Sequence, residues 1–399
     1  MLCILKINPR EKRLVANNFK EKFGNKFFSE NFGVNYLYKP KFVDDFKQIM
    51  SLDILDTMLS KTNIWHSKNF LMMLDQKKLS YADYSSINLE TTGNNYRPDV
   101  NKVENLVARG ASIILNEIEK YNKSLLNVAD ELQKLTNGRC QGNLYFSMAS
   151  HQAFGPHFDL HDVFAIHFEG EKVWNIYENI EKNPINHPTF NLSSEDRRKR
   201  AGKIIDRVTL RPGDLLYIPR GQYHDALASK NGAIHIAFGL SYFKPIDIIS
   251  SLWEKFIIND FMREDIGMNV SEEEVKKLLH KLSDEMNSII NSDEAMHEVT
   301  KNINQWPYQM KHFSLKNLLS KGHFYAIDKS VKFEKSNNKP CLKSPKGMVE
   351  IPQKFSPLIE YIMQQETINE KNLKIQFEHI SDDIIAECIE SLRQMRVIK

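Results

Sequence analysis

The sequence contains few cysteines, and none of them stands near another. Its four cysteines are Cys3, Cys140, Cys341 and Cys388, and no C-x-x-C motif occurs. This spacing predicts neither a disulfide framework nor a cysteine-based zinc site, and it fits a reducing compartment.

Long apolar runs are also missing. No stretch approaches the roughly 20 apolar residues that a membrane-spanning helix requires. The apolar start of the chain, Met1 to Lys6, is not followed by a small-residue cleavage pattern. We therefore expect no signal peptide, no membrane association and a cytoplasmic location.

Neither sign of charge dominates the composition. The chain has 54 basic and 51 acidic residues, a formal net charge of +3. This balance does not by itself indicate a nucleic-acid-binding protein. With 399 residues, of which 41% are hydrophobic, the chain can build two or three domains with cores.

Short strands dominate the middle of the chain. Alternating, β-branched and aromatic patterns predict strands at 144–148, 163–168, 172–177, 207–210, 215–218 and 233–240. A turn is predicted at 169–171, and the insert 179–203 is expected to be a loop or a helical excursion. Helices are predicted before the strands, over 101–120 and 124–135. Many short strands with Gly/Pro turns are typical of a double-sheet jelly roll, the cupin architecture, here with flanking helices in an α+β fold.

The sequence from Lys244 onward is helical again. Ser271 to Glu274 forms a capping box. An apolar stripe follows it at Val275, Leu278, Leu279, Leu282, Met286, Ile289 and Ile290. Such a stripe must be buried either on another helix of the same chain or on a second subunit, and the sequence leaves both open.

The C-terminal segment has the pattern of a small winged-helix unit. A loop or β-hairpin wing is predicted at 329–346, followed by helices at 357–364, 370–377 and 381–395 and a last strand at 397–398. The third helix carries Asp382, Asp383, Glu387 and Glu390. Phosphates would repel this helix, so we expect peptide docking or packing and no DNA binding.

Two histidines and one aspartate stand in a pattern that suits a metal. Residues at i and i+2 of a strand share a face, so His157 and Asp159 can reach one ion. A tight turn, a strand and a second turn, 212–221, then bring His224 back to the same barrel. Two histidines and a carboxylate form the facial triad of non-haem Fe(II) oxygenases, which leaves the opposite face open for a co-substrate and dioxygen. A bare His-x-Asp triplet is a weak signal, because about one is expected by chance in a chain with 13 histidines.

Neighbouring residues allow other interpretations. A triad shifted to His161 is an alternative if the strand stays regular. His235 lies on an apolar strand and is more readily a core histidine, or one that contacts the ligand-binding residues, than a ligand itself. Lys172 would by default be an exposed strand lysine. The basic cluster 197–200 is a solvated loop or, alternatively, a contact for an acidic partner or ribosomal RNA.

The flanking residues strengthen the signal of the triad. The chain reads NLYFSMASHQAFGPHFDLHDVFAIHFEGEKVWNIY over 143–177 and PGDLLYIPRGQYH over 212–224. This resembles the JmjC-type cupin dioxygenases of the ribosomal-oxygenase branch, whose motifs are N-x-Y-x-T/S, G-x-P-H-x-D-x-x-D-V-F, Q-x-x-G-x-K/R-x-W and P-G-D-x-L-Y-I-P-x-G-x-x-H. The resemblance is ordered and correctly spaced over 101–240 and looser before.

The resemblance implies an Fe(II)- and 2-oxoglutarate-dependent dioxygenase that uses O2 to hydroxylate an amino-acid side chain in a ribosomal protein or another peptide. By motif position, His157, Asp159 and His224 are the iron ligands. Lys172 matches the basic residue for the distal carboxylate of 2-oxoglutarate, and Tyr145 and Ser147 match positions that add hydroxyl hydrogen bonds.

The family plan implies a catalytic domain over 1–243, a helical dimerisation region over 244–320 and a winged-helix-like domain over 321–399, so we expect a homodimer. The sequence departs from the family at His167, where glutamine is usual. It also lacks the usual serine or threonine near 237–239. Hydroxylation of a small molecule or a peptide natural product, and a non-catalytic metal-binding cupin scaffold, remain alternatives. The same ligands also take Mn(II).

Overall fold

The computed structural model describes residues 19–90, 93–148, 154–308, 324–336, 339–345 and 347–399. The start of the chain, where no signal peptide is expected, and the expected boundary at residue 320 lie outside the described residues. The chain divides into two compact units, Met1–Met310 and Lys311–Lys399. Among the described helices, none is long and apolar enough to cross a membrane.

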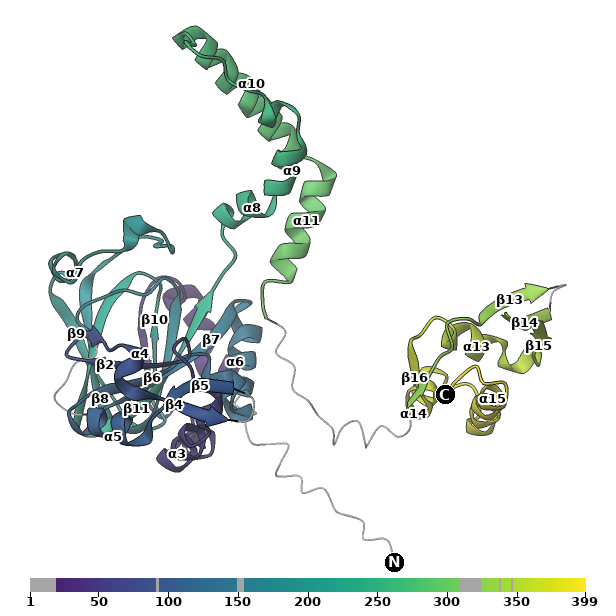
Figure 1. Cartoon of the computed structure of the whole chain (residues 1–399), viewed down its shortest axis with the longest axis horizontal. Coiled ribbons are helices and arrows are strands. Elements are labelled where there is room, and N and C mark those ends of the chain that lie inside the picture. Colours follow the sequence, from purple (N-terminus) through teal and green to yellow (C-terminus); the bar gives the residue numbers. More distant parts are fainter. Residues whose placement is uncertain (1–18, 91–92, 149–153, 309–323, 337–338, 346) are drawn as a thin grey trace, which may run out of the picture. The chain divides into compact units, whose positions relative to one another are not determined.

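The first unit is built around a nine-stranded sheet whose strand pairs are all antiparallel (Figure 1). Two long strands, β8 (Asp162–Ile180) and β11 (Gln222–Ser241), pair with each other over most of their length. Around them the other strands are β1 (Leu37–Lys39), β2 (Phe70–Leu74), β3 (Lys77–Lys78), β6 (Ser112–Leu115), β7 (Arg139–Ser147), β9 (Ile204–Leu210) and β10 (Leu215–Ile218). β10 pairs with the first half of β8, and β9 pairs with its second half. The two halves of each long strand therefore belong to two different layers of the same sheet. This is the α+β jelly roll expected from the sequence.

The predicted helix over 101–120 is wrong in its second half. The helix α5 (Val100–Ala108) ends before Gly110, which has a φ of +97° that favours glycine. The chain then enters β6, whose four residues are all buried between β2 and β7. The isoleucines at 113 and 114 fit both a helical and an extended pattern, and pairing with distant strands decides between them.

The predicted turn at 169–171 is not a reversal of the chain. β8 continues through Gly170, which has a φ of +67°, and a Cβ there would lie 2.0 Å from the carbonyl oxygen of Gly232. The register of β8 against β11 shifts at the same level, between Ala228 and Ala233. A bulge therefore bends β8. The strands predicted at 163–168 and 172–177 form this single bent strand.

The two faces of the bent sheet carry different side chains. The outer face is covered by α1 (Phe19–Phe23) and α6 (Lys123–Thr136), which pack on residues such as Phe164 and Phe168. The predicted helix over 124–135 is thus confirmed, and it ends at the left-handed Asn137. The inner face holds a smaller apolar cluster that includes Val163 and Trp174, which leaves room for polar groups.

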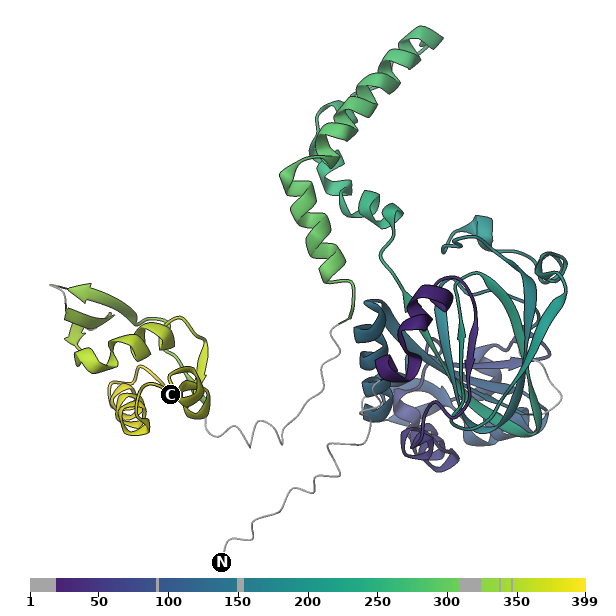
Figure 2. The same ribbon diagram turned by 180° about the vertical axis from the view of Figure 1, so that it is seen from behind.

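Four α-helices follow β11 within the residues described up to 308, and both views show them projecting from the barrel (Figure 2). They are α8 (Pro245–Ser251), α9 (Trp253–Ile258), α10 (Glu272–Ile290) and α11 (Asp293–Asn304). We call them the helical arm. They pack on one another around Leu252, Phe256 and Ala295. The predicted capping box is confirmed, because Ser271 and Glu274 each accept a hydrogen bond from the other's backbone. After α11, Trp306 Nε1 donates to the carbonyl of Ser241 at 2.8 Å and holds the arm to β11.

The second unit combines a small sheet with three helices. Its antiparallel sheet consists of β13 (Lys332–Ser336), β14 (Lys339–Ser344) and β15 (Gly347–Glu350), where a wing or loop is predicted. The three predicted helices are confirmed as α13 (Ser356–Ile362), α14 (Glu370–Gln376) and α15 (Asp382–Gln394). At the end of the chain, Ile398 forms an antiparallel bridge with Ile327.

Candidate metal centre and adjoining pocket

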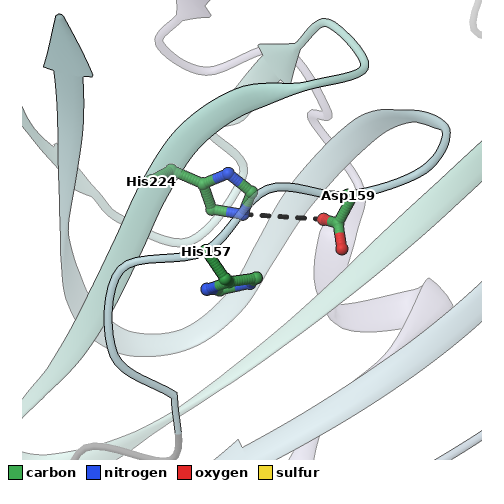
Figure 3. Close-up of side chains that lie close together, drawn as sticks. All are labelled: His157, Asp159 and His224. Carbon is green, nitrogen blue, oxygen red and sulfur yellow. Dashed lines mark ion pairs between the residues drawn. The ribbon is translucent and has the colours of Figure 1, made fainter. Parts of the chain in front are cut away.

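The three predicted ligands come together at one end of the bent sheet. One ligand atom from each of His157, Asp159 and His224 lies within 4.8 Å of the others. Figure 3 shows the two imidazoles and the carboxylate turned toward a common point, with His224 Nε2 3.5 Å from Asp159 Oδ2. His157 and Asp159 do not lie in a regular strand, as the i, i+2 argument assumes. Both residues precede β8 in the chain. His157 forms an isolated antiparallel bridge with His224: the His157 N–H donates to the His224 carbonyl at 3.0 Å, and the His224 N–H donates to the His157 carbonyl at 2.8 Å.

Backbone carbonyls orient both imidazoles. His157 Nδ1 lies 2.8 Å from the oxygen of Gly155, and His224 Nδ1 lies 2.9 Å from the oxygen of Gln222. A carbonyl only accepts, so each Nδ1 carries the hydrogen and each Nε2 offers its lone pair. Two nitrogen lone pairs and a carboxylate oxygen at this separation fit a divalent iron or manganese ion.

The charges at this centre also suit a metal. Burial raises the pKa of Asp159, but the neighbouring His161, His224 and His157 lower it more, so the net shift is downward. Burial, with a smaller contribution from His157, lowers the pKa of His224 to about 4. At neutral pH the aspartate is an anion and His224 is neutral, which are the forms that bind a metal.

A pocket of about 260 Å³ adjoins the triad. Its walls include Tyr145, Phe154, Trp174 and His235, and Lys172 and Arg197 also line it. The Trp174 ring stacks on His224, with ring centroids 5.8 Å apart. The pocket thus has a metal-ligand cluster and a primary amine in one largely aromatic enclosure.

Lys172 is the unusual residue of this pocket. It is 5% exposed, and burial lowers its pKa to about 7. Its Nζ lies 3.3 Å from Ser147 Oγ and 3.5 Å from His235 Nδ1. Within the described part of the chain it forms no ion pair. An isolated buried cation is costly, and an anion could stabilise this one, which no described residue does.

The other predicted co-substrate residues lie around Lys172. Tyr145 lines the pocket, with its ring centroid 5.9 Å from Lys172 Nζ, and burial raises its pKa. Ser147 is buried and does not line the pocket, and its Oγ accepts a hydrogen bond from Lys172 Nζ. Its influence on a ligand therefore passes through the position of the ammonium.

Several alternatives are resolved by position. His161 is outside the ligand cluster; it lines a separate hollow with Asn143 and Gly239, and its Nδ1 lies 3.2 Å from the Asp162 carbonyl. His167 Nε2 lies 3.0 Å from the oxygen of Gly170, and His167 does not line the pocket.

Sequence reasoning missed two residues of the pocket, His235 and Arg197. His235 was assigned to the core, although its partner opposite in β7 is Tyr145. Arg197 lies on α7 (Ser194–Ala201), in the insert predicted to be a loop or a helical excursion, and no role in the pocket was predicted for it. A correct prediction of the register of β11 on β7 would have placed His235 beside Tyr145. Arg197 could be placed only from the path of the insert, which no local sequence pattern indicates.

Comparisons with known proteins agree with this geometry. Residues 115–247 match the family model described as JmjC domain. The bifunctional lysine-specific demethylase and histidyl-hydroxylase NO66 of Dictyostelium discoideum is 30% identical over 213 residues, which cover 53% of this chain and 39% of that protein. The chain therefore spans about two fifths of the length of this relative.

Solved structures resemble the whole chain at lower identity. The X-ray structure of YcfD from Escherichia coli has a TM-score of 0.53 at 15% identity and covers 94% of this chain and 97% of that one. YcfD in complex with cobalt and 2-oxoglutarate, described as a ribosomal oxygenase, has a TM-score of 0.50 at 15% identity with the same coverage. Likeness at this identity shows the fold alone. The family match itself is confined to residues 115–247, a third of the chain, which contain His157, Asp159 and His224.

Proposed function

We propose that the chain is an Fe(II)- and 2-oxoglutarate-dependent dioxygenase that hydroxylates an amino-acid side chain of a ribosomal protein or another peptide. The observation that carries this proposal is the buried Lys172, which lies in the same pocket as the triad and forms no ion pair with any described residue. A metal site with a cation inside the same enclosure matches a ligand with two acidic ends. 2-Oxoglutarate is such a ligand.

Each residue then has a distinct task. His157, Asp159 and His224 would hold the iron. Lys172, positioned by Ser147, pairs with the distal carboxylate of the co-substrate. The aromatic walls exclude water, which strengthens every charged contact inside. Bound iron, 2-oxoglutarate and O2 together supply the oxidation that places one oxygen atom in a C–H bond.

The comparisons support a protein substrate. YcfD is described as a ribosomal oxygenase with bound cobalt and 2-oxoglutarate, and NO66 carries histidyl-hydroxylase in its name. A non-catalytic metal scaffold is less well supported, because a structural metal requires no buried lysine beside it. A small-molecule or peptide natural-product substrate is the remaining alternative. The free, buried Cys140, Cys341 and Cys388 are in keeping with the cytoplasmic location that we propose.

Succinate release and a mass shift test the proposal. Iron-loaded protein with 2-oxoglutarate should release succinate, and ribosomal proteins from cells with the gene should carry a shift of about 16 Da that is absent without it (one oxygen atom). A His157→Ala variant should abolish both signals. If wild-type protein releases no succinate with or without peptide, the oxygenase proposal fails. If the protein releases succinate but ribosomal proteins show no mass shift, the oxygenase activity is supported and a ribosomal substrate is excluded.

We also propose that the helical arm forms a homodimer. α10 has no buried residue, and Val275, Leu279 and Ile290 of its apolar stripe are exposed. Met286 and Ile289 pack within the arm itself, so the chain covers part of the stripe and a second copy would cover the rest. The proposed division is a catalytic domain over 1–243, a dimerisation region over 244–320 and a winged-helix-like domain over 321–399. The acidic start of α15 supports peptide docking or packing by the last unit and no DNA binding.

A further inference from the structure

His235 occupies a fixed position at the Lys172 side of the pocket. It is 3% exposed and lies on β11, and it lines the same enclosure as the triad. Its ring stacks on Tyr145, with centroids 4.7 Å apart and an angle of 8° between the planes. Trp174 meets it edge-on, at 5.2 Å and 87°. Two aromatic contacts therefore fix the direction in which each ring nitrogen points.

The neighbouring lysine determines where the hydrogen of this imidazole resides. Lys172 Nζ lies 3.5 Å from His235 Nδ1, at the long end of the hydrogen-bond range. A protonated amine only donates, so Nδ1 accepts, and the hydrogen of the neutral ring is on Nε2. No described residue accepts a hydrogen bond from His235 Nε2. His235 lines the pocket, so a ligand held there can accept this hydrogen bond.

We propose that His235 binds the co-substrate directly, by donating Nε2–H to the distal carboxylate that pairs with Lys172, and that its ring limits the length of the diacid. This inference rests on the proposed function. A carboxylate has about four acceptor positions, so it can take both the ammonium and the imidazole N–H. The ring lines the pocket and its Nδ1 lies 3.5 Å from Lys172 Nζ, so its removal enlarges the pocket at the lysine end and should relax the preference for 2-oxoglutarate over 2-oxoadipate.

His167 provides a matched control. It is the residue opposite His235 in β8, and it is also a buried histidine near Lys172. Its Nε2 is used by the carbonyl of Gly170 at 3.0 Å, and it lies outside the pocket lining. A His167→Gln change keeps a donor for that carbonyl, so it alters the same layer of the barrel without altering the pocket wall.

The test is calorimetric binding of 2-oxoglutarate and 2-oxoadipate to the full chain loaded with Mn(II). His235→Phe keeps the ring contacts and removes both nitrogens, and we expect it to weaken 2-oxoglutarate binding roughly tenfold or more, the effect of one hydrogen bond to a charged group. His235→Gln, which retains an N–H donor, should recover most of the affinity. His235→Ala should bring the dissociation constants of 2-oxoglutarate and 2-oxoadipate closer to each other. His167→Gln should bind like the wild type, and all variants should bind Mn(II) equally.

The outcomes separate the two proposals. If His235→Phe binds 2-oxoglutarate like the wild type, or if His167→Gln loses as much affinity, the role of His235 is overturned while the oxygenase proposal stands. If the Mn(II)-loaded wild type binds no 2-oxoglutarate, the proposed function fails, and the inference about His235 fails with it.

Discussion

The barrel interior and the helical arm depart from an ordinary soluble fold in opposite ways. The interior buries polar and charged groups, among them Lys172, His224 and His235. The arm exposes apolar ones, with Leu279 57% and Trp253 58% exposed. Each arrangement costs free energy, and neither is explained by contacts within the described chain.

The difference indicates what kind of partner each region requires. A buried cation without a counter-charge costs several kcal/mol and is stabilised by an anionic ligand. An exposed large apolar side chain forgoes about 1.5–3 kcal/mol, which a second protein surface can recover. The barrel therefore points to small polar ligands and the arm to another protein chain. Changes in the barrel should have the larger effects.

Loss of a metal ligand should have the largest effect. Asp159→Ala should reduce bound iron after dialysis and lower succinate release by more than about 100-fold, because the anionic ligand of the triad is gone. Asp225→Asn is the control: its carboxylate accepts hydrogen bonds from Asn175 at 2.7 Å and from Tyr177 at 2.6 Å, outside the ligand cluster. Iron retained by Asp159→Ala would show that the interior cluster is not a metal site.

The convergence of the three triad side chains was also the feature of the site that the sequence predicted best. His157, Asp159 and His224 stand in ordered motifs whose turns and spacing are local properties of the chain. His235 could not be assigned in this way, because its position depends on a bulge in β11 and on the register with β7. The misassigned isoleucines at 113 and 114 have the same cause: their pairing partners lie about forty residues away in Leu71 and Met72, and periodicity does not report on them.

Replacement of the buried cation should come second. Lys172→Met keeps the aliphatic stem and removes the charge, and it should weaken 2-oxoglutarate binding about 100-fold or more. The ligand-free variant should unfold with a free energy about 1–4 kcal/mol higher, because a buried charge has been replaced by an apolar group. Calorimetry and chemical denaturation measure the two quantities. Lys199→Met, an exposed lysine on α7 paired with Glu195, should change neither. A destabilised Lys172→Met would mean that the lysine serves the fold and not a ligand.

The arm should respond to a change of polarity on its exposed stripe. Leu279→Asp should weaken self-association by roughly 100-fold, since each of two copies loses an apolar contact of about 1.5–3 kcal/mol. Light scattering over a concentration series measures this. Lys277→Glu, also exposed on α10 but off the stripe, should leave the mass unchanged. Wild-type protein that is monomeric at all concentrations would show that the exposed stripe serves some other surface. Succinate release by the Leu279→Asp monomer would show that the two regions act independently.

The smallest of these effects is a pH dependence that belongs to the barrel alone. Burial lowers the pKa of Lys172 to about 7 from its ordinary 10.5. The ligand-free lysine therefore loses its proton as the pH rises through 7, whereas binding of the distal carboxylate needs the ammonium. The dissociation constant for 2-oxoglutarate should be flat below pH 7 and rise by up to about tenfold per pH unit above it, until the pKa of the bound state is reached. The unfolded chain keeps this proton up to pH 10.5, so the ligand-free protein should gain stability between pH 7 and 10.5 from this group. Lys172→Met should remove the pH dependence of 2-oxoglutarate binding and of stability that this lysine causes. Self-association through the arm should not change with pH over this range. A flat binding profile in the wild type would mean that an anion already holds Lys172 charged, and the contrast between the two regions would then disappear.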